Sequence, residues 1–137
     1  MPLLLEIITP EKKAYSGIID SVILPTQNGE IGVLPGHIPL LAMVEPGELQ
    51  VTVGGQTEYL AIDRGFVQVI GDKVSVLTEQ AISVTALDLS VIDAARSRAE
   101  KALEEAKKSG EDPTAVEEAE RILRFAIAQR LIKDRRR

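Results

Sequence analysis

The 137-residue sequence has no cysteine, no tryptophan and a single histidine. The lack of cysteine excludes disulfides and thiolate metal sites, and one histidine leaves too few ligands or bases for most metal centres and catalytic triads. We therefore expect no catalytic residues and no metal ligands. A hydrolase or a small-molecule binder would need ionisable groups that converge in a pocket, so both classes are disfavoured on the same grounds.

Long apolar runs and an excess of positive charge are missing too. No stretch approaches the ~20 apolar residues of a membrane span, and the N-terminal MPLLLEI has no basic region, so it predicts a first strand and no signal peptide. A net charge of -5 and a pI near 5.0 count against nucleic-acid binding. Aromatic residues make up 3% of the chain and apolar residues 45%, which predicts a core built from aliphatic side chains.

The residues that are present divide the chain into two halves. Nine of the ten glycines and six of the seven prolines precede Asp72, whereas nine of the fourteen alanines follow Leu87. Residues 1–87 carry four basic and ten acidic groups, a net of -6, and residues 88–137 carry twelve basic and eleven acidic groups, a net of +1. We predict one domain over residues 1–87 and a second over residues 88–137.

The first half predicts a β-sandwich or barrel, because short apolar segments alternate with turn residues. Gly54-Gly55 and Gly71-Asp72 each predict a tight hairpin, and Val67 and Val69 around Gln68 indicate a strand with one buried face. We expect about ten strands in two packed sheets, without parallel pairing because no helix intervenes. The candidate strands are residues 3–9, 18–24, 29–33, 40–44, 49–53, 58–62, 66–70 and 74–77.

The second half predicts an antiparallel hairpin of two helices. Ser90 or Asp88 can cap the first helix, Ser109-Gly110 ends it, and Asp112-Pro113 begins the second as N-cap and first helical residue. A seam of small residues at heptad spacing would let the helices approach closely. It comprises Ala95, Ala99, Ala102 and Ala106 on the first helix and Ala115, Ala119, Ile122 and Ala126 on the second. A second apolar line, Val116, Leu123, Ile127 and Leu131, remains for the sandwich or for a partner.

The segment from Asn28 to Leu41 is the most constrained by its backbone. It holds three glycines, two prolines and the only histidine, which predicts a rigid, exposed loop between two short strands. Such a loop presents side chains to a partner and does not build a core.

Residues 29–41, GEIGVLPGHIPLL, resemble the GELG(I/V)xPGHxPLL segment of the ε subunit of F-type ATP synthases. The likeness continues in order through Pro46-Gly47, Ala61-Ile62, residues 65–69 and residues 74–77, and it extends to an alanine-rich tail of the expected length. The resemblance implies a flattened β-sandwich of about ten strands followed by a regulatory helical hairpin. It also implies a non-catalytic rotor subunit of the proton-translocating enzyme, peripheral to the cytoplasmic face of a bacterial membrane.

In that family the sandwich links the γ subunit to the membrane-embedded c ring. The resemblance places Glu30 against the polar loops of the c ring, His37 near γ, and Ile31, Gly32, Val33 and Leu34 on the same contact surface. The hairpin permits ATP hydrolysis when folded down and blocks it when extended towards the α and β catalytic subunits. Arg130, Lys133, Arg135, Arg136 and Arg137 form a basic end suited to acidic loops of the β subunits.

Some relatives bind regulatory ATP through an (I/L)-Asp-x-x-Arg-Ala motif, which this sequence matches in two ways. Spacing from Val76-Leu77 selects LDLSVI at residues 87–92, with Asp88 in place and Val91 where the arginine should stand. Appearance selects IDAARS at residues 92–97 instead, with Asp93 and Arg96 but no alanine. We prefer the first match, which leaves Arg98, Arg124 and Arg130 as weak nucleotide ligands. Valine cannot pair with phosphate as arginine does, so we expect no tight ATP binding and no cofactor.

A stand-alone β-sandwich adaptor whose hairpin recruits a helical partner is the alternative function. Composition does not separate this alternative from a rotor subunit. The match over residues 29–41 favours the rotor subunit.

Overall fold

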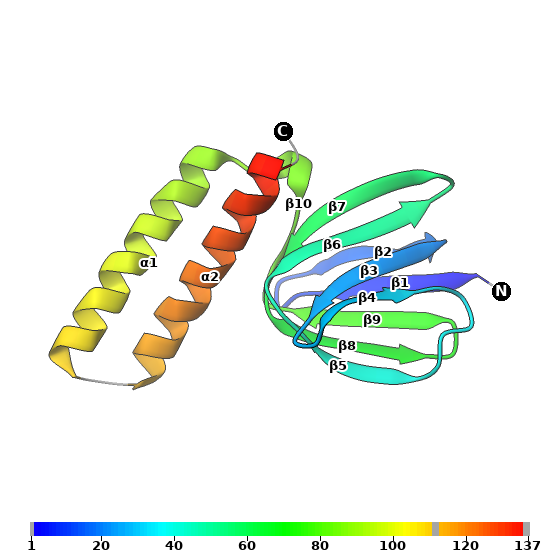
Figure 1. The fold of residues 1–137 in the computed structure, drawn as a ribbon, viewed down its shortest axis with the longest axis horizontal. Coiled ribbons are helices and arrows are strands. Elements are labelled where there is room, and N and C mark those ends of the chain that lie inside the picture. Colours follow the sequence, from blue (N-terminus) through cyan, green and yellow to red (C-terminus); the bar gives the residue numbers. More distant parts are fainter. Residues whose placement is uncertain (1, 111–112, 136–137) are drawn as a thin grey trace. The chain divides into compact units, whose positions relative to one another are not determined.

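The computed structural model describes residues 2–110 and 113–135. The chain forms two compact units, Met1–Thr85 and Ala86–Arg137, so the observed boundary lies two residues before the predicted one. The first unit is a β-sandwich and the second a pair of helices (Figure 1). Asp112, Arg136 and Arg137, which carried a predicted helix cap and part of the basic end, lie outside the described residues.

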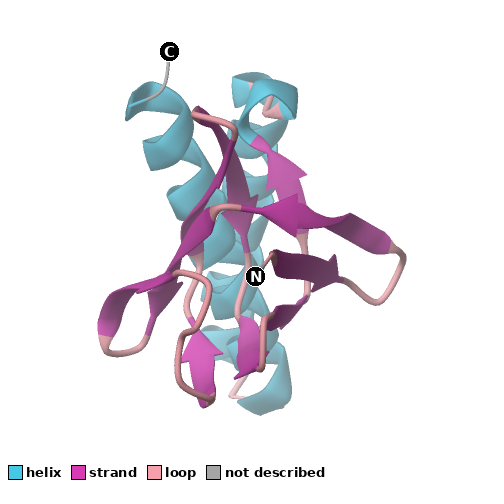
Figure 2. Ribbon diagram, turned by 90° about the vertical axis from the view of Figure 1, so that its right-hand side faces the viewer, coloured by secondary structure: helices cyan, strands magenta, loops and turns pink. Residues whose placement is uncertain are grey.

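Ten strands build the first unit, as predicted. One layer contains β3 (Ser21–Thr26), β4 (Gly29–Val33), β6 (Gly47–Val53), β7 (Gln56–Ile62) and β10 (Ala81–Ser83). The other contains β1 (Leu3–Ile8), β2 (Lys13–Ile19), β5 (Leu40–Val44), β8 (Gly65–Ile70) and β9 (Lys73–Thr78). The pair Thr26 and Val44 joins β3 to β5, and β2 lies near β6, so the two layers form a nearly closed sandwich (Figure 2).

The core lies between the layers and consists of sixteen buried side chains, all Leu, Ile or Val. This confirms the prediction of an aliphatic core. Val67 and Val69 are fully buried, while Gln68 between them is exposed, as the alternation indicated. The Gly54-Gly55 turn has φ of 57° and 79°, values that glycine adopts without strain, and it joins β6 to β7 as predicted.

Three predictions about the strands were wrong. The segment 18–24 contains the end of β2 and the start of β3, and Asp20 marks the corner between them, since its carboxylate accepts from the Gly54 amide at 2.7 Å. β10 was missed because three residues carry no readable periodicity. β1 and β9 pair in parallel, against the prediction, because the intervening strands supply a connection long enough without a helix.

The second unit consists of α1 (Leu89–Ser109) and α2 (Pro113–Arg135), preceded by a 3-10 turn at Val84–Ala86. Asp88 is the N-cap of α1, which decides between the two predicted caps, and Gly110 ends this helix at φ 64°. Of the predicted seam, Ala99, Ala119 and Ala126 are buried. Ala102, Ala115 and Ile122 are exposed, because the strict heptad spacing drifts from the 3.6-residue turn of a straight helix. Among the described residues, no helix is both long and apolar enough to cross a membrane.

Gly65 offers a sharp test of the sandwich geometry. A Cβ built on Gly65 would lie 1.8 Å from the carbonyl oxygen of Leu77 on β9, so a Gly65→Ala variant must displace backbone. We expect the free energy of unfolding to fall by about 3 kcal/mol, measured by urea denaturation. Gly32→Ala on β4 is the matched control, because a Cβ there meets nothing within 4 Å and should change stability little. Equal losses in both variants would contradict the close approach.

Candidate functional site

The predicted contact segment is β4 together with the loop that joins it to β5. The loop is held at two points: the His37 amide donates to the Leu34 carbonyl at 3.1 Å, and the Gly36 amide donates to Asp72 Oδ1 at 3.1 Å. Gly36 has φ of 86°, which a residue with a side chain rarely adopts. The loop is therefore a fixed structure that presents Leu34 and Ile38, whose exposed fractions are 63% and 75%.

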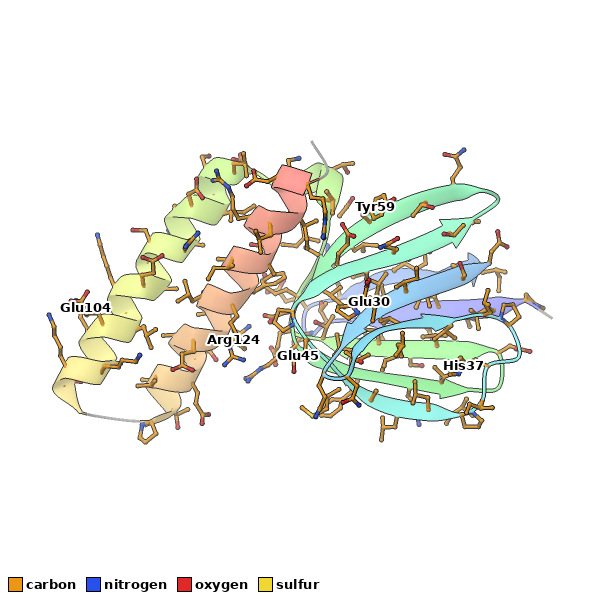
Figure 3. The ribbon with its side chains drawn as sticks, in the orientation of Figure 1. Glu30, His37, Glu45, Tyr59, Glu104 and Arg124 are labelled. Atoms are coloured by element: carbon orange, nitrogen blue, oxygen red, sulfur yellow. The ribbon has the colours of Figure 1, made fainter. Side chains whose placement is uncertain are left out.

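The structure divides the six predicted contact residues by burial. Glu30, Gly32 and Leu34 are exposed, and His37 is half-buried with its Nδ1 2.7 Å from the Ile38 carbonyl oxygen. Ile31 packs against the core, and Val33 is fully buried opposite Val22, so Val33 has no side-chain surface for a partner. Glu30 stands on the second residue of β4 and His37 beyond its far end, so the two face different ends of the strand (Figure 3).

A second surface, which sequence reasoning missed, crosses four adjacent strands on the outside of the sandwich. Cross-strand pairing aligns Met43 on β5 with Phe66 on β8, Phe66 with Leu77 on β9, and Leu77 with Ile8 on β1. Their exposed fractions run from 37% to 52%. We call these four residues the apolar strip. At about 4.8 Å per strand spacing it is about 14 Å wide.

Shallow grooves border the apolar strip on both sides of Phe66. One, of about 340 Å³, is lined by Ile8, Phe66 and Leu77 together with residues 9–10, 64–65 and 78–79. The other, of about 420 Å³, is lined by Leu41, Met43 and Phe66 together with residues 26–28, 40 and 42. A contiguous apolar surface of this kind marks an interaction site in soluble proteins. The sequence did contain a signal for this surface, namely two apolar residues at successive strand positions, as in Phe66-Val67 and Val76-Leu77. Because successive side chains of a strand point to opposite faces, one residue of each pair must lie on the outer face.

Beside the apolar strip, one carboxylate bridges two lysines on neighbouring strands. Glu6 on β1 accepts from Lys13 Nζ on β2 and from Lys73 Nζ on β9, each at 2.8 Å. These hydrogen bonds, first to Lys13 and then to Lys73, lower the pKa of Glu6 from 4.5 to about 2. The bridge places paired charges beside the apolar strip, in a row that also contains Ser75 and Gln68.

In the helical unit, three of the predicted nucleotide ligands, Asp88, Arg124 and Arg130, already have other partners. The Asp88 carboxylate accepts from the Ser90 hydroxyl at 2.7 Å and from the Ser90 and Val91 amides at 2.9 and 3.5 Å, which lowers its pKa. Arg124 lies 3.6 Å from Glu120 on its own helix, and Arg98 is exposed on α1. No group of three His, Cys, Asp or Glu side chains able to hold a metal occurs within residues 2–110 and 113–135.

Arg130 on α2 forms a two-point ion pair with α1. Its Nη1 donates to both carboxylate oxygens of Asp93 on α1, at 2.7 and 2.6 Å, and its Nε donates to Asp134 at 3.1 Å. These bonds, led by the one to Asp93, raise the pKa of Arg130. Asp93 is the aspartate of the second match to the ATP motif. Of the remaining basic end, Lys133 is half-buried and Arg135 is exposed.

Residues 2–84 match the family model of the β-sandwich domain of the ATP synthase delta/epsilon chain. The chain belongs to this family. It is 40% identical to the ATP synthase epsilon chain of Syntrophobacter fumaroxidans over 91% of its own length and 90% of that relative. It is 36% identical to the ATP synthase epsilon chain of Neisseria meningitidis serogroup B, over 90% of this chain and 87% of the relative.

Solved structures agree with the fold. A chain of the mitochondrial ATP synthase of Euglena gracilis, solved as an OSCP, F1 and c-ring assembly, matches with a TM-score of 0.75 at 21% identity, over 96% of this chain and 81% of that one. A chain from the central stalk and c ring of the Tetrahymena thermophila enzyme matches with a TM-score of 0.54 at 14% identity, over 63% of this chain and 69% of that one. The resemblance read from residues 29–41 and the prediction of a non-catalytic ATP synthase subunit are confirmed by the epsilon-chain relatives.

The ion pairs of Glu6 with Lys13 and Lys73 make the stability of the sandwich depend on pH. A carboxylate whose pKa is lower in the folded than in the unfolded chain stabilises the fold while it is ionised. This contribution is complete above pH 4.5 and is lost as the pH falls towards 2. We expect wild type to be more stable than Glu6→Gln near neutral pH and the difference to vanish towards pH 2, measured by urea unfolding. Glu11→Gln, at an exposed loop carboxylate, controls for the lost charge; the same pH-dependent difference in that variant would contradict a specific role for Glu6.

Proposed function

We propose that this chain is a central-stalk rotor subunit of a proton-translocating F-type ATP synthase. Its sandwich binds the γ subunit and the c-ring loops, and its helical hairpin restrains ATP hydrolysis. Family membership supports the assignment to ATP synthase, and the two structural neighbours belong to assemblies that contain a c ring, one of them with the central stalk. In such an assembly the chain is peripheral to the cytoplasmic face of a bacterial membrane.

The apolar strip is the observation that carries the proposed contact with γ. Apolar side chains across four strands, with Phe66 at the centre, are costly to leave in water and would stabilise a complex when buried. Phe66 borders both grooves, the position in which an aromatic anchor contributes most to a protein interface. The Glu6 bridge at the border resembles the polar rim that surrounds such interfaces.

β4 and its loop support the proposed contact with the c ring. Glu30 is exposed at one end of β4, and Leu34 and Ile38 protrude from a loop fixed by the bond to Asp72. A fixed loop loses little conformational entropy when a partner binds, which favours a contact under rotational load. We therefore assign Glu30, Gly32, Leu34 and His37 to the contact surface for γ and the c ring.

The hairpin supports the proposed restraint on hydrolysis. Three of its seven buried residues are alanines, which bury little apolar area, and this brings the closed pair nearer in energy to open arrangements. Intrahelical ion pairs such as Arg121 with Glu118 at 2.7 Å favour helix even without a neighbour. Lys133 and Arg135 then give α2 a basic end for acidic loops of the α and β catalytic subunits. Tight ATP binding is not part of the proposal, because Val91 lacks a guanidinium and Arg130 is paired with Asp93.

Replacing Phe66 tests the contact with γ. We expect Phe66→Ala to weaken binding to a γ-containing F1 complex by about 2 kcal/mol or more, about thirtyfold in Kd, measured by isothermal titration. Val53→Ala is the matched control, because Val53 is exposed to 42% at the end of β6, outside the apolar strip, and should leave Kd unchanged. Unchanged binding by the Phe66 variant would remove the apolar strip from this interface.

Removing the hairpin tests the restraint on hydrolysis. We expect an assembled complex that carries residues 1–87 alone to hydrolyse ATP about fivefold faster than one with the full chain, because a typical regulatory coupling is of that size. The measurement is steady-state hydrolysis by the purified complex, with equal incorporation of both forms as the control. Equal rates of ATP hydrolysis in both complexes would contradict the regulatory part of the proposal.

A further inference from the structure

The contact between Arg130 and Asp93 differs from four other ion pairs of the helical unit, which each lie within one helix. Arg96 with Glu100, Lys108 with Glu104, Arg121 with Glu118 and Arg124 with Glu120 each join residues three or four apart on one helix. Pairs of that spacing stabilise a helix by itself and say nothing about its neighbour. Arg130 and Asp93 are 37 residues apart and connect α2 to α1.

The pair joins the two helices at the end of the hairpin where no loop connects them. Gly110 and the following residues tie the helices covalently at one end of the hairpin. Asp93 lies in the first two turns of α1, and Arg130 lies in the last two turns of α2, so the pair closes the opposite, open end. Three alanines, Ala99, Ala119 and Ala126, are buried between the two ends, and the larger buried residues Ile92, Phe125 and Ile132 lie in the half of the hairpin near the open end.

We propose that Asp93 and Arg130 form a latch that holds the open end of the hairpin shut. Asp134, one turn further along α2, accepts from Nε of Arg130 and holds the guanidinium in the orientation that reaches Asp93. When the latch breaks, the last turns of α2 leave α1 and, without the support of tertiary packing, fray more often, so their backbone amides exchange faster. The regulatory consequence rests on the proposed function, in which the extended hairpin is the form that blocks hydrolysis.

The ion pair of the latch is weak enough to allow the hairpin to open and close reversibly. The side chains of Arg130 and Asp93 are 33% and 53% exposed, so water and salt screen their attraction. An exposed pair of this kind shifts an equilibrium by about two- to fivefold. Closure is therefore favoured but reversible, and high ionic strength opens the hairpin further.

Hydrogen exchange in the isolated full-length chain tests the latch, because it reports rare opening without added probes. The substitution is made on α1, and the exchange of backbone amides is measured on α2. We expect Asp93→Asn to speed exchange of the backbone amides of residues 125–130 about two- to fivefold, and to leave the amides of β1 and β9 unchanged. Arg130→Gln should do the same, and the double variant should exchange no faster than either single one, because all three lack the same bond.

Glu100→Gln is the matched control, since it neutralises an acid on α1 whose partner, Arg96, lies on the same helix. It should leave exchange on α2 at the wild-type rate. Unchanged exchange in Asp93→Asn, additive effects in the double variant, or an equal effect of Glu100→Gln would each overturn the latch. None of these outcomes involves the assembled enzyme, so they are separate from the hairpin-deletion test, whose failure would overturn the regulatory role while leaving the latch intact.

Discussion

The packing of aliphatic side chains between two sheet layers is the constraint on which the rest of the sandwich depends. Each strand alternates its side chains between two faces, and the sixteen core residues occupy the inner set. These residues are Leu, Ile and Val without aromatic bulk. Within one layer, Gly65 on β8 approaches the Leu77 carbonyl on the neighbouring β9 so closely that no side chain would fit. Register is then fixed, since a slip by one residue would expose the whole core.

A fixed register also decides the character of the outer face. Once Val67 and Val76 point inward, Phe66 and Leu77 must point outward, and strand pairing aligns them with Met43 and Ile8. The apolar strip is therefore a consequence of the same pairing that buries the core. A subunit that functions inside a complex tolerates such a face, because a partner covers it in the working state.

In the helical unit, each helix is stabilised mainly by interactions within itself, and packing between elements contributes less than it does in the sandwich. Its helices are supported by caps and by ion pairs within each helix, whereas the residues buried along them mix three alanines with Ile92, Phe125 and Ile132. Helix formation and helix pairing are thus supported by different interactions. One surface ion pair, Arg130 with Asp93, shifts the pairing of the helices about two- to fivefold.

Local features could be predicted from the sequence because backbone conformation and periodicity depend on neighbouring residues. The Gly54-Gly55 hairpin, the inward face of Val67 and Val69, the end of α1 at Gly110 and the family segment at residues 29–41 are of this kind. The parallel pairing of β1 with β9, the burial of Val33, the alignment of the apolar strip and the contact of Arg130 with Asp93 join residues distant in the chain. Only the tertiary structure decided these, because each depends on how the whole unit packs and no local pattern encodes which distant residue becomes the neighbour.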